Sequence, residues 1–286
     1  MFEVIYLLKS IVMGIVEGVT EFLPISSTGH LIISQSLLGL PADRFNAMFM
    51  VVIQLGAILA VLLLFWPRIW TKLGAFFRGQ AEGRQFMRVW ILGCLPAVVL
   101  GLGWEILDLD AWLFRIPVVA AAMIVGAVLL LVLERRAPGS AAASGQPGAA
   151  VTTTDKVEDI SNRQALTVGL MQCLSLWPGF SRSAATIMGG WLAGFTTPLA
   201  ADYSFFLAIP IMFGASGLKL VRFDFAGIAG YQIASLIVGF VVSFVVALLV
   251  VKAFLAFLHR HRLAVFAWYR IAVGALLILL LAVGVL

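Results

Sequence analysis

The amino-acid sequence predicts an all-α polytopic membrane protein. The chain has 286 residues, of which 62% are hydrophobic and only 12% are charged, whereas about one quarter of the residues in a soluble domain are charged. The apolar stretches are long and lack the alternating polarity that a membrane β-barrel requires. Six of them are long enough for a helix to cross a bilayer, and they cover residues 46–66, 87–104, 117–133, 198–219, 230–252 and 264–286.

Two further apolar stretches, residues 4–38 and 164–194, are interrupted by Pro, Gly, Ser and charged residues. An uninterrupted membrane helix is therefore not expected in either of them. Irregular backbone is tolerated inside a membrane only where protein or a water-filled cavity surrounds it. We predict that each stretch forms a broken, re-entrant helical hairpin, which enters the membrane and returns on the same side.

The distribution of Lys and Arg predicts the orientation of the chain. These residues gather in three connecting stretches, residues 67–88, 134–165 and 252–263, whereas the stretch 105–115 is mostly acidic. Because basic connections stay in the cytoplasm, both termini are expected outside, and both hairpins must be re-entrant for the topology to close. The net charge of +5 is therefore expected to set the orientation of the chain and to attract anionic lipid headgroups, rather than to bind nucleic acid.

The chain divides into two halves that resemble each other. Residues 1–136 are predicted to form a first repeat and residues 164–286 a second, joined by a flexible cytoplasmic linker, residues 137–163, which is rich in Ala, Gly, Ser and Pro. Since the first hairpin would open outward and the second inward, the repeat is inverted. Such architectures place their site near the midplane, where the broken segments meet. The residues that align at one common offset are Gly14 with Gly169, Ser26 with Ser181 and Thr28 with Ser183.

The first hairpin contains an unusually polar run, EGVTEFLPISSTGH, which starts at Glu17. Glu17 and Glu21 lie four residues apart and share a helix face. Because two carboxylates on one face repel each other, and each costs about 2.5–3.5 kcal/mol at mid-bilayer, a divalent cation, Mg²⁺ or Ca²⁺, or a water-filled cavity is expected beside them. The alternative is that both glutamates reach water at the level of the lipid headgroups.

The same run carries a serine and a histidine after its break. Pro24 interrupts the first helix, and Ser27 and His30 then lie three residues apart, so a second helix would place them on one face. A serine beside a histidine suits nucleophilic attack with acid–base assistance. A histidine that is merely packed and hydrogen-bonded in the core is the alternative.

The second hairpin carries the run WPGFSRSAAT, residues 177–186. Arg182 within it is the only basic residue between Arg163 and Lys219. A Pro-Gly break followed by a helix exposes backbone N–H groups that suit an anion, and a guanidinium matches phosphate oxygens. A structural salt bridge from Arg182 to the acid pair is the alternative. Together, the two hairpins would combine an acid pair, a nucleophile, a base and an anion clamp, a set that suits hydrolysis of a phosphate or diphosphate.

Residues 17–30 and 178–186 resemble the two signature stretches of the undecaprenyl-diphosphatase family, the bacitracin-resistance proteins of bacteria. The likeness extends along essentially the whole chain, including VVIQLGAILAV at 51–61. The resemblance implies hydrolysis of the polyprenyl diphosphate lipid to its monophosphate and inorganic phosphate, which recycles the lipid carrier for cell-wall synthesis. It also implies a divalent cation and a multi-pass location in the bacterial inner membrane, with the site open to the periplasmic face.

The positions that match the family define the predicted site. Glu17 and Glu21 are similar to its acidic pair and are predicted to hold the metal. The predicted catalytic residues are Glu21, Ser27, His30 and Arg182, and the predicted substrate-binding residues are Ser26, Thr28, Ser181, Arg182, Ser183 and Thr186. The chain departs from the family pattern at Ala184, which replaces a usual glycine, and at Met50, which replaces a common acidic residue.

A transporter or flippase of lipid phosphate or of another anion is the alternative function, since inverted repeats with broken helices are a transporter architecture. A lipid phosphatase of the other membrane type is excluded, because that type expects a histidine after Arg182 at the spacing where this chain has Met188. The expected partners are the polyprenyl diphosphate and membrane lipids but not nucleic acid, and a homodimer is left open.

Overall fold

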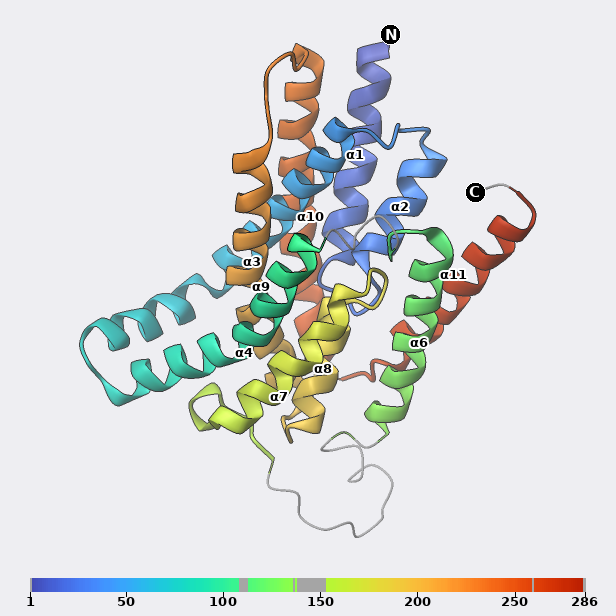
Figure 1. Cartoon of the computed structure of the whole chain (residues 1–286). Coiled ribbons are helices and arrows are strands. Elements are labelled where there is room, and N and C mark those ends of the chain that lie inside the picture. Colours follow the sequence, from blue (N-terminus) through green and yellow to red (C-terminus); the bar gives the residue numbers. More distant parts are fainter. Residues whose placement is uncertain (1, 108–112, 136, 138–152, 259, 285–286) are drawn as a thin grey trace.

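The computed structural model describes residues 2–107, 113–135, 137, 153–258 and 260–284, and they form a bundle of helices (Figure 1). The all-α prediction is confirmed for these residues, where β-type pairing is limited to one isolated bridge. The helices are α1 (Phe2–Thr20), α2 (Ser27–Leu37), α3 (Arg44–Phe77), α4 (Ala81–Ile106), α6 (Ile116–Glu134), α7 (Asn162–Gln172), α8 (Arg182–Leu192), α9 (Thr197–Arg222), α10 (Gly230–Leu258) and α11 (Ala264–Ala282), with the 3-10 turns η2 (Val157–Asp159) and η3 (Cys173–Leu176).

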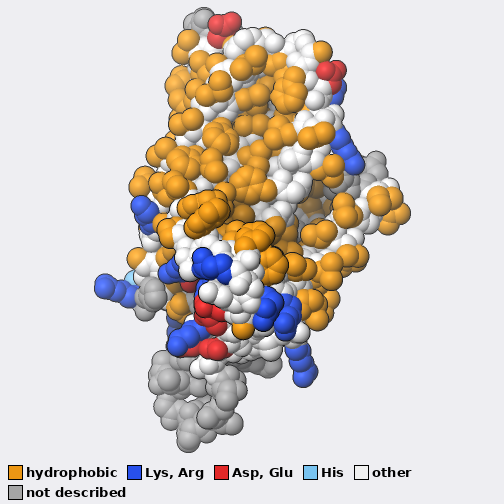
Figure 2. Space-filling model, turned by 90° about the vertical axis from the view of Figure 1, so that its left-hand side faces the viewer, with side chains coloured by type: hydrophobic (Ala, Val, Ile, Leu, Met, Phe, Trp, Pro, Cys, Tyr) orange, Lys and Arg blue, Asp and Glu red, His pale blue; other side chains and the backbone are white. Residues whose placement is uncertain are grey.

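The six predicted membrane spans are confirmed as helices. Within the described residues, α3, α4, α6, α9, α10 and α11 are long and apolar enough to cross a membrane, so the chain is a multi-pass membrane protein. Figure 2 shows a face that is mostly hydrophobic, with Lys and Arg gathered toward one end. The exposed basic residues at the end of α3, in its connection to α4 and at the start of α4 are Arg68, Arg78, Arg84 and Arg88, whereas Arg44 is exposed at the other end of α3.

Helix α3 continues beyond the expected end of its span at residue 66, with Pro67 inside the helix. Ala75, near the end of α3, is buried and packs on α4, where a Cβ added at Gly83 would lie 2.4 Å from the Ala75 carbonyl carbon. Hydropathy therefore marks the end of the apolar span, whereas packing against α4 sets the end of the helix. As a result, the basic stretch 67–88 is helical on both sides of a short turn.

Both broken segments form a helix, a break and a second helix, as predicted. The chain reverses between α1 and α2 and again between α7 and α8, and Figure 1 shows the two pairs approaching each other from opposite ends of the bundle. The pairs touch at their turns, where the Ser183 hydroxyl of α8 donates to the Leu23 carbonyl at 3.0 Å. The side from which each pair enters a bilayer stays a prediction, as does the inverted repeat.

The linker expected over residues 137–163 lies partly outside the described residues, which resume shortly before Thr154. From there the chain is anchored to the second hairpin, because the Thr154 N–H donates to the Gly194 carbonyl at 3.0 Å. After η2, Ser161 and Gln164 form a capping box that starts α7. The last part of the linker is therefore structured and leads directly into the hairpin.

Glycines allow α1 and α3 to approach α10 closely. A Cβ added at Gly56 of α3 would lie 2.4 Å from the Phe240 carbonyl oxygen, and one added at Gly18 of α1 would lie 2.8 Å from the Ser243 carbonyl oxygen. Both contacts are with backbone atoms, which cannot rotate away. Small residues of this kind let membrane helices pack at short distance. The contact of α1 with α10 sets the position of the helix that carries both glutamates.

The substitution Gly56→Val is expected to destabilise the protein by about 1–3 kcal/mol or more, because the branched side chain overpacks the α3–α10 contact. Thermal unfolding in detergent measures the effect. Gly214→Val in α9 is the matched control, since a Cβ there meets no atom within 4 Å. Equal unfolding midpoints for the two variants would contradict the prediction.

Candidate active site

The same unusual turn precedes α2 and α8. Ser26 has a φ of 74° and Ser181 a φ of 75°, a region that residues other than glycine rarely adopt. Each serine hydroxyl accepts a hydrogen bond at the start of its helix, from the N–H of Gly29 at 3.4 Å and from the N–H of Ala184 at 3.3 Å. The alignment of Ser26 with Ser181 in the sequence therefore corresponds to a shared backbone conformation, which persists only where the surroundings enforce it.

A cavity of about 160 Å³ lies where the two turns meet. Its wall contains groups from both broken segments and from the neighbouring helices α3 and α9. The lining residues are Glu21, Ser26, Ser27, Thr28, Gln54, Ser175, Gly179, Ser181, Arg182 and Met212. The structure thus brings six of the predicted site residues to one cavity, although they come from stretches that are far apart in the sequence.

Glu21 connects the two broken segments inside this cavity. Its Oε2 accepts a hydrogen bond from the Ser27 hydroxyl, and its Oε1 pairs with Nη2 of Arg182 at 3.4 Å. The ion pair is largely buried, with side-chain exposures of 8% for Glu21 and 12% for Arg182, and low polarity strengthens such a pair. The salt bridge considered as an alternative for Arg182 therefore exists, but it lies where a phosphate group could replace the carboxylate as the partner of the arginine.

Glu17 is completely buried, and neither carboxylate oxygen has a hydrogen-bond partner among the described residues. This burial contradicts the alternative in which Glu17 reaches water. Glu17 lies one helical turn before Glu21 on the same face of the segment. An unpartnered carboxylate beside a second one fits a hard divalent cation. The described residues contain no group of three or more His, Cys, Asp or Glu that could hold an ion, so further ligands would be hydroxyl, amide or backbone oxygens, water or substrate.

His30 does not line the cavity, and both of its ring nitrogens face protein groups. Nδ1 donates to the Ser26 carbonyl at 2.7 Å, and in the neutral ring Nε2 accepts from the Tyr269 hydroxyl, also at 2.7 Å. The His30 and Tyr269 rings are stacked, with centroids 5.5 Å apart. Ser27, which was expected to face His30, is hydrogen-bonded to Glu21 instead. The reason is that Ser27 is the first residue of α2, beside the turn that carries Glu21.

The hydroxyls of Ser183 and Thr186 are engaged within the protein. Ser183 contacts the first turn, as described above, and Thr186 shares a 2.6 Å hydrogen bond with Ser204 of α9 and donates to the Arg182 carbonyl at 2.9 Å. Neither residue lines the cavity. These contacts hold α8 against its neighbours, and a direct contact with substrate stays a prediction for both residues.

The structure adds residues that the sequence analysis did not select. Gln54 of α3, Ser175 of η3 and Met212 of α9 line the cavity, and Arg270 of α11 is completely buried. A lone polar or charged residue in an apolar span was the available signal for Gln54 and Arg270. Nothing in the local pattern distinguished Ser175 or Met212.

A larger cavity, of about 520 Å³, lies between α3, α4, η2 and α9. It contains none of the predicted site residues. Several of its charged side chains already neutralise each other, since Arg68 pairs with Asp202 at 2.9 Å and Lys72 pairs with Glu158. The chemistry is therefore assigned to the smaller cavity.

Fold and cavity together define the class of protein: a multi-pass helical membrane protein with a buried site of carboxylate, hydroxyl and guanidinium groups. The chain belongs to the family of the bacitracin resistance protein BacA, whose family model matches residues 10–276.

Relatives of known name agree with this assignment. An undecaprenyl-diphosphatase of Clostridium tetani is 42% identical over 96% of both chains. Undecaprenyl-diphosphatase 2 of Clostridioides difficile is 42% identical over 97% of this chain and 96% of its own, and an undecaprenyl-diphosphatase of Acinetobacter baumannii is 42% identical over the same shares. The resemblance inferred from the two sequence motifs is thereby confirmed.

Proposed function

We propose that this protein hydrolyses undecaprenyl diphosphate to undecaprenyl phosphate and inorganic phosphate, and so recycles the lipid carrier of cell-wall synthesis. The position of Glu21 between Ser27 and Arg182 in one cavity carries the proposal. It combines a nucleophile, an acceptor for its proton and an anion-binding group in a small space. The names of the relatives supply the same substrate, and the name of the family supplies resistance to bacitracin.

In the proposed mechanism, Ser27 attacks the terminal phosphorus while its proton passes to Glu21. The bond from that phosphorus to the bridging oxygen breaks, and undecaprenyl phosphate leaves with the electron pair. Water then attacks the phosphoserine, which releases inorganic phosphate and restores the hydroxyl. Direct attack by a water molecule that Glu21 deprotonates is the competing route, and it leaves Ser27 unmodified throughout.

Arg182 would bind the diphosphate when substrate oxygens replace Glu21 as its partner, because a guanidinium forms bidentate contacts with phosphate. Glu17 and Glu21 are the residues that would hold the divalent cation, which would supply positive charge to the phosphate oxygens. Glu17 is suited to this role, since no protein donor competes for its oxygens among the described residues.

We place the protein in the bacterial inner membrane, with the prenyl tail among the apolar helices and the site open to the periplasmic face. The large apolar side chains exposed on the spans support the membrane location, and the basic end in Figure 2 supports a cytoplasmic position for that end. A homodimer stays a prediction.

The proposal predicts that the purified protein in detergent releases phosphate from undecaprenyl diphosphate. Removal of divalent cations by a chelator is expected to lower the rate by about 100-fold or more, the usual scale for losing one charge-stabilising group, and added Mg²⁺ or Ca²⁺ should restore it. An unchanged unfolding midpoint after chelation is the control for loss of fold. No release from folded protein with any cation would reject the enzyme and favour transport of lipid phosphate, which a proteoliposome translocation assay would detect.

The substitution Tyr269→Phe is expected to lower the rate of phosphate release by about tenfold. It removes one hydrogen bond that orients the His30 ring, and that ring holds the carbonyl of Ser26, which lines the cavity. Trp268→Phe is the matched control, since this neighbouring side chain is exposed on the outer surface of α11. Steady-state phosphate release measures both variants. A Tyr269→Phe variant with the full rate would show that the tyrosine hydroxyl is not needed to orient His30.

A further inference from the structure

Arg270 of α11 is a buried cation that the proposed reaction does not use. Its side chain has no exposed surface, and it is the largest fully buried side chain among the described residues. Arg270 takes part in none of the ion pairs among the described residues. A buried charge without a counterion is costly, and inside membranes such residues are usually kept for a function.

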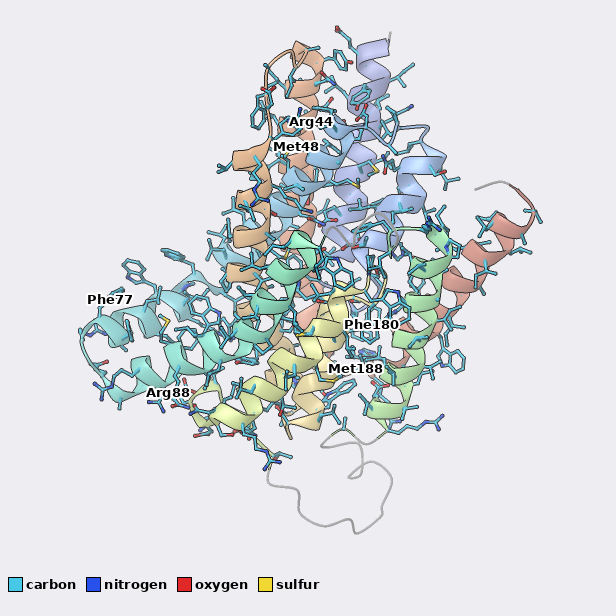
Figure 3. The ribbon with its side chains drawn as sticks, viewed as in Figure 1. Arg44, Met48, Phe77, Arg88, Phe180 and Met188 are labelled. Carbon is cyan, nitrogen blue, oxygen red and sulfur yellow. The ribbon has the colours of Figure 1, made fainter. Side chains whose placement is uncertain are left out.

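The guanidinium of Arg270 binds backbone carbonyls. Nη2 donates to the carbonyl of Phe180 at 2.7 Å, to that of Gly179 at 3.3 Å and to that of Ala122 in α6 at 3.4 Å. Figure 3 shows Phe180 between α8 and α6. Gly179 and Phe180 directly precede Ser181, so two of the three contacts hold the irregular turn that leads into α8.

This turn has an uncommon shape and forms part of the cavity wall. Gly179 has a φ of 98°, and Ser181 also has a positive φ. A Cβ added at Gly179 would lie 2.4 Å from the Val119 carbonyl oxygen, so α6 packs directly against the turn. Gly179 lines the cavity but Arg270 does not. Any effect of Arg270 on the reaction must therefore pass through the turn.

The two turns are held in different ways. In the first turn, His30 donates to the carbonyl of Ser26 from within the same hairpin. The position of the second hairpin that aligns with His30 is occupied by Ala185, whose side chain has no donor. Arg270 supplies donors to the second turn from a different helix, and it binds the carbonyls of Gly179 and Phe180 rather than that of the serine.

We propose that Arg270 is a positioning residue, which holds the turn from Gly179 to Ser181 so that Arg182 enters the cavity. The inference rests on the proposed function, because it assigns Arg270 a role in that reaction. A serine with positive φ persists only where neighbouring groups enforce it, and the hydrogen bonds from Nη2 to the carbonyls of Gly179 and Phe180 contribute to this here. The remaining guanidinium nitrogens, Nε and Nη1, have no partner among the described residues, so all hydrogen bonds of this side chain go from Nη2 to backbone carbonyls.

Gly126 of α6 provides the space for this contact. A Cβ added there would lie 2.3 Å from Nη2 of Arg270 and 3.1 Å from the Phe180 carbonyl oxygen. The substitution Gly126→Ala would therefore displace the flexible guanidinium without removing its charge. Gly274→Ala is the matched control for crowding between α11 and α6, because its Cβ would lie 2.7 Å from the Ile124 side chain and 3.2 Å from the Ala120 carbonyl oxygen, neither of which belongs to the turn or to Arg270.

The test compares the wild-type protein with Arg270→Met, Arg270→Lys, Gly126→Ala and Gly274→Ala by two measurements. The first is kcat/KM for undecaprenyl diphosphate, and the second is amide hydrogen exchange over residues 177–185, with residues 164–172 of α7 as internal reference. We expect Arg270→Met to lose about 100-fold in kcat/KM, the scale of a small misplacement of a binding group, and to exchange faster in the turn alone. Arg270→Lys should recover most of both losses, and Gly126→Ala should be intermediate. Gly274→Ala should keep the wild-type exchange in the turn, since it crowds the helix contact without displacing Arg270.

The proposal would be overturned if Arg270→Met had the same kcat/KM and the same amide exchange in the turn as the wild-type protein. Faster exchange spread evenly over α6, α7 and α11 would also overturn it, because that result indicates a merely structural role. If the wild type releases no phosphate, the proposed function fails separately, while the exchange comparison still decides whether Arg270 holds the turn.

Discussion

The substitution Glu21→Gln is expected to reduce the rate of phosphate release by about 10²–10⁴-fold, the range attributed to a general base. The amide keeps the shape of the carboxylate but cannot take the proton of Ser27. It also removes the negative charge that pairs with Arg182 at 3.4 Å and one of the two proposed cation ligands. No other described side chain is hydrogen-bonded to the Ser27 hydroxyl, so none is in position to take its proton in place of Glu21.

The measurement is phosphate release at saturating substrate, with Glu82→Gln as control. Glu82 is an exposed carboxylate that pairs with Lys72 outside the cavity, and its loss should leave the rate unchanged. If Glu21 activates Ser27, the double variant Glu21→Gln with Ser27→Ala should be no slower than the slower single variant, because groups that act as a unit are not additive. Substantial turnover in Ser27→Ala alone would favour direct attack by water, and a fully active Glu21→Gln would remove Glu21 from the mechanism.

The substitution Arg182→Ala is expected to lower kcat/KM by about 10²–10³-fold, the usual cost of removing a group that stabilises charge in the transition state. Arg182→Lys should recover only part of this loss, since an ammonium keeps the charge but not the planar fork that matches phosphate oxygens. Kinetics with undecaprenyl diphosphate separate an effect on KM from one on kcat. Arg68→Ala, at an exposed arginine paired with Asp202, is the control.

Loss of fold must be separated from loss of chemistry in Arg182→Ala. Removing one partner of a buried ion pair costs about 3–5 kcal/mol, because the other charge stays buried and unpaired. The double variant Arg182→Met with Glu21→Gln removes both charges and should recover thermal stability but not activity. Recovery of activity in that double variant would show that the pair is structural.

Much of the fold could be predicted from the sequence because the signals are local. Membrane helices follow from the length of apolar stretches, and the two breaks follow from Pro24 and Pro178, which lack an N–H and stop a helix. The positions of the helix ends were harder to predict from the sequence. Helix α3 extends to Phe77 because residues beyond the apolar span still pack on α4.

The composition of the site was predictable in part. Glu21, Ser27 and Arg182 were selected because each is polar in an apolar setting, and the structure places all three in one cavity. The partner of Ser27 was not predictable, because it depends on the turn at Ser26, whose positive φ no rule assigns to a serine. That turn directs the Ser27 hydroxyl to Glu21 and the His30 ring to Tyr269.

By itself, the sequence determined that this is a multi-pass helical membrane protein, where its helices break and which polar residues lie at the breaks, because composition, periodicity and proline act over a few residues. Only the tertiary structure decided that Glu21 bridges Ser27 and Arg182, that Glu17 is left without a donor, and that Arg270 of the last helix holds the second turn. These are contacts between side chains from distant segments. They depend on how helices rotate and pack, and no local pattern in the chain records that rotation.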